Sequence, residues 1–147
     1  MSQTTSASVA PTPTVLVVDD DDFSREVIGE MLKVQGVTDV SCADSANEAL
    51  NILSGMNSTP DVMICDVFMP DMDGIEFMGA LADRHYTGAV VLVSGVDVQM
   101  LSLASDIAAG GGILLLGTFT KPLRPDALSA MLAKWRGLSA SGPAQIP

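Results

Sequence analysis

Five short apolar runs, each followed by a segment with helical periodicity, constrain the fold of this 147-residue chain more than any other feature. The runs are four to six residues long, and all but the second are nearly continuous in apolar character. Runs of this length form strands, and strands without apolar–polar alternation are typical of parallel sheets buried on both faces. The five predicted strands comprise residues 15–18, 37–42, 61–66, 89–93 and 113–116.

The segments between the runs have the apolar spacing of amphipathic helices. In 46–53, for example, apolar residues recur at i, i+3, i+4 and i+7. Ser45 and Glu48 have the spacing of a capping box at the start of this segment. Pro125 suits the first turn of a last helix, whose predicted buried stripe ends at Trp135. Five successive strand–helix units predict an α/β fold, a three-layer sandwich with a five-stranded parallel sheet and right-handed crossovers.

The composition fits one globular domain and excludes some partners. Apolar residues make up 48% of the chain, enough for a hydrophobic core, and the net charge is −11. An acidic balance disfavours nucleic acid and anionic membrane surfaces, which attract clustered Lys and Arg, and no apolar segment is long enough to span a membrane. Cys42 and Cys65 lie in apolar stretches, so we expect buried thiols in a reducing, cytoplasmic compartment, with a disulfide as the alternative.

Both ends of the chain have the composition of tails. Residues 1–13 are rich in Ser, Thr, Ala and Pro and contain neither a basic residue nor the apolar core of a secretory signal. Residues 138–147 have a similar composition, typical of a tail or a linker. We therefore expect a flexible N-terminal tail over 1–13, one folded domain over 14–137 and a C-terminal tail or linker over 138–147.

Polar side chains follow four of the five predicted strands. Asp19 and Asp20 follow the first strand, Asp66 ends the third, Ser94 follows the fourth and Lys121 comes after the fifth. Because the carboxyl ends of parallel strands meet at one edge of a sheet, we expect these side chains to converge there.

The run of four aspartates at 19–22 needs something to offset its repulsion. Two like charges about 4 Å apart repel by roughly 4 kcal/mol at an effective dielectric constant of about 20. Acidic runs usually splay into water, but the convergence with Asp66 and Lys121 favours a bound divalent cation. Magnesium prefers oxygen ligands, with Asp20 and Asp66 as direct carboxylates and Asp19 acting through water.

Such a site suits phosphoryl transfer onto a carboxylate. An aspartate can act as a nucleophile and form an aspartyl phosphate. Transfer then depends mainly on positioning and on positive charge around the phosphoryl oxygens. Lys121 supplies a point charge for one such oxygen, and Ser94 supplies a hydrogen bond for another.

Four motifs, in order along the chain, resemble the receiver domains of two-component response regulators. They are the acid pair in VLVVDDD, the phosphoacceptor strand and loop in DVFMPDMDG, the hydroxyl motif VSG, and the pair Lys121–Pro122, whose peptide bond is typically cis in that family. The resemblance covers residues 14–136. It implies the flavodoxin-like strand order 2-1-3-4-5.

The resemblance also implies the roles of the site residues. Asp66 is the phosphoacceptor, and Ser94 and Lys121 bind the phosphoryl group. Mg²⁺ is held by Asp19, Asp20, Asp66 and the backbone carbonyl of Phe68. The phosphoryl group comes from a histidine kinase or a phosphotransfer protein, and the phosphorylated protein switches a partner or a tethered output domain. A receiver domain of this kind is a phosphoprotein and not a turnover enzyme.

The sequence departs from the family pattern in three places. Thr118 stands where the family usually has a switch aromatic, and Phe119 is shifted by one residue, which turns it to the other face of the strand. The segment 112–121 is lengthened and resembles receivers joined to EAL-type cyclic-di-GMP phosphodiesterase outputs, so we expect such an output domain beyond this chain. Phe68 and Val96 place apolar side chains near the site, where they hinder an attacking water and favour a long-lived phosphorylated form.

Two other functions compete with the receiver. The Asp19–Asp21 triplet superficially resembles the nucleophile motif of haloacid-dehalogenase-type phosphatases, but no second acidic pair follows Lys121. A receiver-like scaffold that works without phosphorylation is the other alternative, against which the complete set of site residues argues. The apolar residues of the helix over 98–108, the strand over 113–116 and the last helix fit either the core or a homodimer face.

Overall fold

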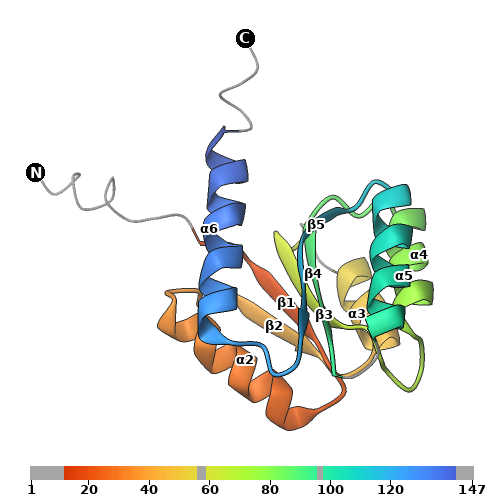
Figure 1. Ribbon diagram of the computed structural model, residues 1–147, viewed down its shortest axis with the longest axis horizontal. Helices are drawn as coiled ribbons and strands as arrows, with labels where there is room; N and C mark the ends of the chain where they lie inside the picture. The colour runs from red at the N-terminus through yellow and green to blue at the C-terminus, as the bar shows by residue number, and fades with distance from the viewer. Residues whose placement is uncertain (1–11, 56–58, 96–97, 142–147) are drawn as a thin grey trace, which may run out of the picture.

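The computed structural model describes residues 12–55, 59–95 and 98–141 (Figure 1). At its centre lies one five-stranded sheet in the order β2-β1-β3-β4-β5, and every pair of neighbouring strands is parallel. Helices α2 and α6 cover one face of the sheet, and helices α3, α4 and α5 cover the other (Figure 1). The predicted three-layer α/β sandwich and its strand order 2-1-3-4-5 are confirmed.

Strands and helices alternate along the chain from β1 to α6. The strands are β1 (Val15–Val18), β2 (Val40–Ala43), β3 (Val62–Asp66), β4 (Ala89–Ser94) and β5 (Leu114–Thr120). The helices are α2 (Asp22–Val34), α3 (Ala46–Gly55), α4 (Gly74–Asp83), α5 (Val98–Gly110) and α6 (Pro125–Ser141).

Two hydrophobic clusters, one on each face of the sheet, hold the three layers together. In β1, Leu16 and Val18 belong to the cluster beneath α3, α4 and α5, whereas Val15 and Val17 belong to the cluster beneath α2 and α6. Every residue of β1, β3 and β4 is buried, as the continuous apolar runs predicted. Burying a Val or Leu side chain contributes about 1.5–3 kcal/mol, so these three strands form a rigid platform for the residues at their carboxyl ends.

The two cysteines differ in their surroundings. Cys65 in β3 is buried as expected, and this burial raises the pKa of its thiol well above the ordinary value. The expectation that Cys42 is buried is wrong, because Cys42 lies in β2, an edge strand that is only partly covered by helices. Both cysteines are free thiols, so the alternative prediction of a disulfide is wrong.

Strand β5 is longer than its apolar run predicted, because it continues to pair with β4 as far as Thr120. The register with β4 shifts between Val90 and Val91, which leaves Leu116 as an extra residue in β5. A bulge of this kind absorbs one residue without ending the pairing of the two strands. It brings Lys121 to the carboxyl edge of the sheet despite the lengthened segment.

The aromatic residue near the end of β5 faces away from the position that the family uses. Phe119 packs against the cluster beneath α2 and α6, whereas Thr118 lies on the opposite face of the strand and is exposed. The Phe119 ring occupies the space beside Gly117, where an added Cβ would lie 2.9 Å from the ring carbons. The predicted change of face is therefore present in the structure.

Helix α6, with 17 residues, extends past the sheet at the end opposite the carboxyl edge (Figure 1). Trp135 packs against the cluster beneath α2 and α6, in agreement with the predicted apolar stripe. Among the described residues, no helix combines the length and the apolar character needed to cross a bilayer.

Candidate functional site

Four strand ends bring the predicted site residues to one edge of the sheet. Asp19 directly follows β1, Asp66 and Ser94 are the last residues of β3 and β4, and Lys121 directly follows β5. Carboxylate oxygens of Asp19, Asp20 and Asp66 lie within 4.8 Å of one another. Asp19, Asp66 and Ser94 are buried, whereas Asp20 is exposed, so the acidic cluster opens to solvent on one side.

Lys121 neutralises part of this negative charge. Its Nζ lies 2.9 Å from Asp19 Oδ2 and 2.9 Å from Asp66 Oδ2. Burial lowers the pKa of Lys121, but its hydrogen bonds to Asp66 and Asp19 outweigh that effect and raise the pKa above its ordinary value. The ammonium group is therefore charged at neutral pH and is aimed at the carboxylate that the sequence assigns as phosphoacceptor.

The Asp66 carboxylate is oriented by two donors on different elements. The Phe68 N–H donates to Asp66 Oδ1 over 3.0 Å, and Lys121 donates to Asp66 Oδ2 over 2.9 Å. Burial raises the pKa of Asp66, and the bonds from Phe68 and Lys121 offset this only in part, while the charge of Asp19 raises it further. Asp66 thus sits where additional positive charge would stabilise its ionised form.

Arg25 contributes to the site although the sequence pattern did not single it out. Its Nη1 donates to the backbone carbonyl of Asp19 over 2.6 Å, and its guanidinium also pairs with Asp22. The Asp21 N–H donates to Asp19 Oδ1 over 2.9 Å, and Asp21 is the N-cap of α2. These contacts fix the turn from β1 into α2 and thereby orient Asp19. The sequence feature that could have indicated this role is the position of Arg25, one helical turn beyond the acidic run at 19–22.

The two ends of the loop between β3 and α4 lie close together beside Asp66. Its base is held by a hydrogen bond from the Gly74 N–H to the Val67 carbonyl over 2.6 Å. A Cβ at residue 74 would lie 2.7 Å from the Val67 Cβ, so this close approach requires glycine. Within the loop Met69 is buried and Phe68 is 66% exposed. Phe68 therefore lies in solvent next to the site, and Val96, its predicted counterpart, lies outside the described residues.

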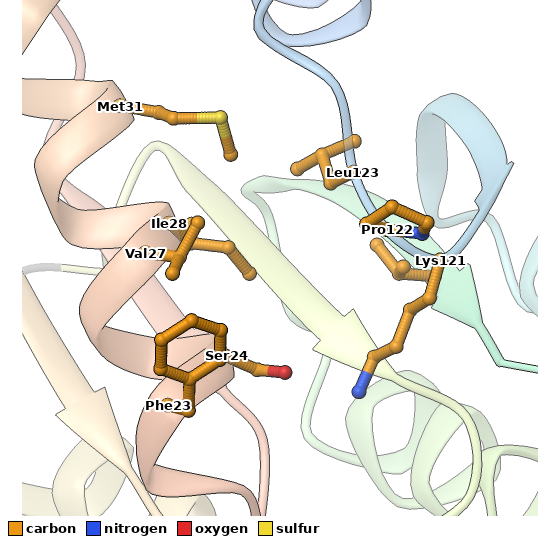
Figure 2. Close-up of a pocket in the computed structure, with 9 residues that line it drawn as sticks. Phe23, Ser24, Val27, Ile28, Met31, Lys121, Pro122 and Leu123 are labelled. Carbon is orange, nitrogen blue, oxygen red and sulfur yellow. The ribbon is translucent and has the colours of Figure 1, made fainter.

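An apolar groove opens next to the acidic cluster (Figure 2). Its volume is about 340 Å³, and it runs between α2 and the segment that follows β5. Figure 2 shows side chains of α2 along one side, Pro122 and Leu123 on the other, and the Lys121 amine at the end nearest Phe23 and Ser24. Phe23 is 70% exposed, so an apolar surface leads directly to the lysine that contacts Asp66.

The residues at the acidic edge fit a hard divalent cation. Asp19, Asp20 and Asp66 offer carboxylate oxygens, the ligand type that Mg²⁺ prefers, and the exposure of Asp20 leaves room for the waters that Mg²⁺ retains. Three carboxylates and the single ammonium of Lys121 leave two uncompensated negative charges, which a divalent cation would balance. The peptide bond between Lys121 and Pro122 is cis, as the resemblance implied.

The fold and the acidic edge together define a flavodoxin-like domain of the receiver class. The model of the family described as response regulator receiver domain matches residues 15–133, and the chain belongs to this family. Receiver domains of this family act as phosphoacceptors in two-component signalling and bind Mg²⁺ at an acidic site.

Curated relatives and solved structures agree with this membership. The chain is 35% identical over 107 residues to a protein-glutamate methylesterase/protein-glutamine glutaminase of Halobacterium salinarum, covering 73% of this chain and 29% of that protein. It is 31% identical over 102 residues to the Regulator of RpoS of Escherichia coli, covering 69% of this chain and 29% of that protein. The aligned region thus spans less than a third of the length of either relative.

Two solved structures show the same fold with more than a quarter of the residues identical. A response regulator from Colwellia psychrerythraea superposes with a TM-score of 0.70 at 27% identity, covering 88% of this chain and 98% of that chain. A response regulator receiver protein from Pseudomonas putida superposes with a TM-score of 0.67 at 28% identity, covering 86% of this chain and 99% of that chain.

Proposed function

We propose that Asp66 accepts a phosphoryl group from a histidine kinase or a phosphotransfer protein, and that Ser94 and Lys121 bind the transferred group. The observation that carries this assignment is the position of Asp66, a buried carboxylate at a strand end within 2.9 Å of the Lys121 ammonium and beside two further carboxylates. A nucleophile, a counter-charge and a cation site thus occupy the same edge of the sheet.

Each residue of the site has a separate role in the transfer of the phosphoryl group. An Asp66 oxygen forms a bond to phosphorus while the bond from phosphorus to the donor nitrogen or oxygen breaks, and the donor leaves with that electron pair. Asp19, Asp20 and the backbone carbonyl of Phe68, with Asp66, would hold Mg²⁺, which neutralises charge on the phosphoryl oxygens when bound. Lys121 already contacts Asp66, so a small movement of its side chain brings the ammonium to a phosphoryl oxygen.

A phosphatase and a receiver differ in turnover. We expect a single stoichiometric phosphorylation, with an acyl phosphate that hydroxylamine cleaves, because the chain offers no second acidic pair beyond Lys121. Steady release of nitrophenol from para-nitrophenyl phosphate would instead favour the haloacid-dehalogenase-type alternative. A phosphorylated product that resists hydroxylamine would place the phosphoryl group on a hydroxyl rather than on Asp66.

The apolar groove beside Lys121 suits the docking of the phosphodonor protein. A donor histidine must reach Asp66 from solvent, and the groove provides apolar contact area immediately beside that approach. Phe23→Ala is expected to slow transfer from a phosphohistidine protein by about tenfold, the effect of losing one exposed aromatic anchor. The rate with acetyl phosphate, which needs no docking surface, should not change.

The control for this prediction is Leu103→Ala. Leu103 is also an exposed apolar residue, but it lies in α5 on the other face of the sheet. Equal slowing by both substitutions, or slowing of the acetyl phosphate reaction by Phe23→Ala, would contradict the docking role of the groove.

Cation binding predicts a measurable change in stability. Without Mg²⁺, Asp66→Asn is expected to raise the free energy of unfolding, because it removes one of three clustered carboxylates. Folding raises the pKa of Asp66, so above this raised pKa the ionised carboxylate lowers the free energy of unfolding of the wild type. As the pH falls from the raised pKa to the ordinary value of 3.8, Asp66 becomes protonated in the folded state before it does in the unfolded state. The stability difference between Asp66→Asn and the wild type should therefore shrink over that range. Mg²⁺ at 100 times its Kd should stabilise the wild type by about 2.7 kcal/mol and the variant by less. Urea unfolding in EDTA and in Mg²⁺ measures both effects, and a variant less stable in EDTA would contradict this account.

Other parts of the sequence hypothesis remain proposals. We place the protein in the cytoplasm and retain an EAL-type output domain as the expected downstream partner. We assign the receiver domain to residues 14–137, preceded by a tail over 1–13. The predicted C-terminal tail or linker over 138–147 starts too early, because α6 continues to Ser141. The face formed by α5, β5 and α6 exposes Leu103, Ile107 and Leu114 and is our candidate for a homodimer contact.

The exposed Phe68 supports a long-lived phosphorylated form, and a phosphoryl half-life of seconds would contradict that expectation.

A further inference from the structure

The first turn of α3 receives hydrogen bonds from a residue that is remote in sequence. The Asp71 carboxylate, in the loop between β3 and α4, accepts from the Ala46 N–H through Oδ1 over 3.3 Å and from the Asn47 N–H through Oδ2 over 2.9 Å. The hydroxyl of the local cap Ser45 accepts from the Glu48 N–H over 3.0 Å. Helix N-termini leave their first N–H groups without intrahelical partners and favour negative charge, so both oxygens of Asp71 make favourable contacts there.

These bonds tie the tip of the β3–α4 loop to a neighbouring element. At its base the loop is closed by the bond from Gly74 to Val67, and at its end Asp73 and Glu76 form the capping box of α4. Without Asp71, the described hydrogen bonds hold only the two ends of the segment between Phe68 and Met72. The carboxylate of Asp71 therefore adds a third anchor at the middle of the loop.

We propose that Asp71 is a positioning residue, which holds the β3–α4 loop and with it the backbone of Phe68 in the geometry that binds the cation and the phosphoryl group. This inference rests on the proposed function, because it gives the anchored loop a role at that site. Asp71 bonds to α3 rather than to the acidic cluster in this structure, so it acts through the loop. Partners that orient metal ligands typically change metal affinity by 10- to 100-fold when they are removed.

The experiment compares Asp71→Ala with Ser45→Ala, a matched control. Both substitutions remove a cap from the same end of α3, but only Asp71 connects that end to the β3–α4 loop. Thermal unfolding should show a lowered Tm for both variants. Titration calorimetry with MgCl₂ should show about a tenfold weaker affinity for Asp71→Ala and an unchanged affinity for Ser45→Ala. Hydrogen exchange at the Phe68 amide, which donates to Asp66, should accelerate only in Asp71→Ala.

Asp71→Asn separates anchoring from charge. Its amide oxygen can still accept from the first turn of α3, so its Mg²⁺ affinity should lie closer to the wild type than to Asp71→Ala. Unchanged affinity in Asp71→Ala, or an equal loss in Ser45→Ala, would overturn the positioning role. A wild-type chain that binds no Mg²⁺ would overturn the proposed function, and this inference with it.

Discussion

Replacing Lys121 by methionine is expected to slow the phosphorylation of Asp66 by acetyl phosphate about 100-fold, the usual effect of removing one preorganised charge-stabilising donor. Lys121 is the only cation within 2.9 Å of Asp66 among the described residues, and it also pairs with Asp19. The methionine keeps the apolar stem but leaves no ammonium to meet the developing charge on the phosphoryl group. Initial rates at saturating Mg²⁺, followed by intact mass, measure the effect.

Lys134→Met provides the matched control. The Lys134 ammonium donates to the Leu116 carbonyl, on β5 and away from the acidic cluster, over 3.3 Å. This variant should be phosphorylated at the wild-type rate. If Lys121→Met also retained the wild-type rate, the assignment of Lys121 to the phosphoryl site would be wrong.

Phe77→Ala is expected to lower the free energy of unfolding by about 3–5 kcal/mol, the range for truncating a buried phenylalanine. Phe77 lies in α4, is 0% exposed and belongs to the cluster beneath α3, α4 and α5. A domain of this size is stable by about 5–15 kcal/mol, so this single change removes a large share of the total. Urea unfolding followed by circular dichroism measures the difference.

Phe23→Ala serves as the control for the same chemical change at the surface. Because Phe23 is 70% exposed, its truncation should alter the free energy of unfolding by no more than about 0.5 kcal/mol. A similar loss of stability in the two variants would contradict the burial that the structure assigns to Phe77.

The central strands could be predicted because their sequences carry an unambiguous signal. In β1, β3 and β4 nearly every residue is apolar, and both faces of these strands are buried. Strand β5 was harder to delimit, since Gly117 and two threonines interrupt its apolar run although pairing with β4 continues through them. Its bulge depends on the register with β4, which no local pattern encodes.

The residues of the candidate site could be predicted from the sequence, but the contacts that hold them in place could not. Asp19, Asp66 and Lys121 stand at strand ends, so the parallel topology alone brings them to one edge of the sheet. The bonds from Arg25 to the Asp19 carbonyl and from α3 to Asp71 depend on how helices and loops approach each other in space. Asp71 is 24 residues from Asn47, and a side chain that caps a distant helix leaves no periodic trace in the sequence.

Intact mass after incubation with acetyl phosphate, with and without Mg²⁺, tests the central claim most directly. The wild-type chain should gain the mass of one phosphoryl group only when Mg²⁺ is present, and Asp66→Asn should gain none under the same conditions. A wild-type chain that stays unmodified in Mg²⁺, or an Asp66→Asn variant that is modified as readily as the wild type, would contradict the assignment of Asp66 as the phosphoacceptor.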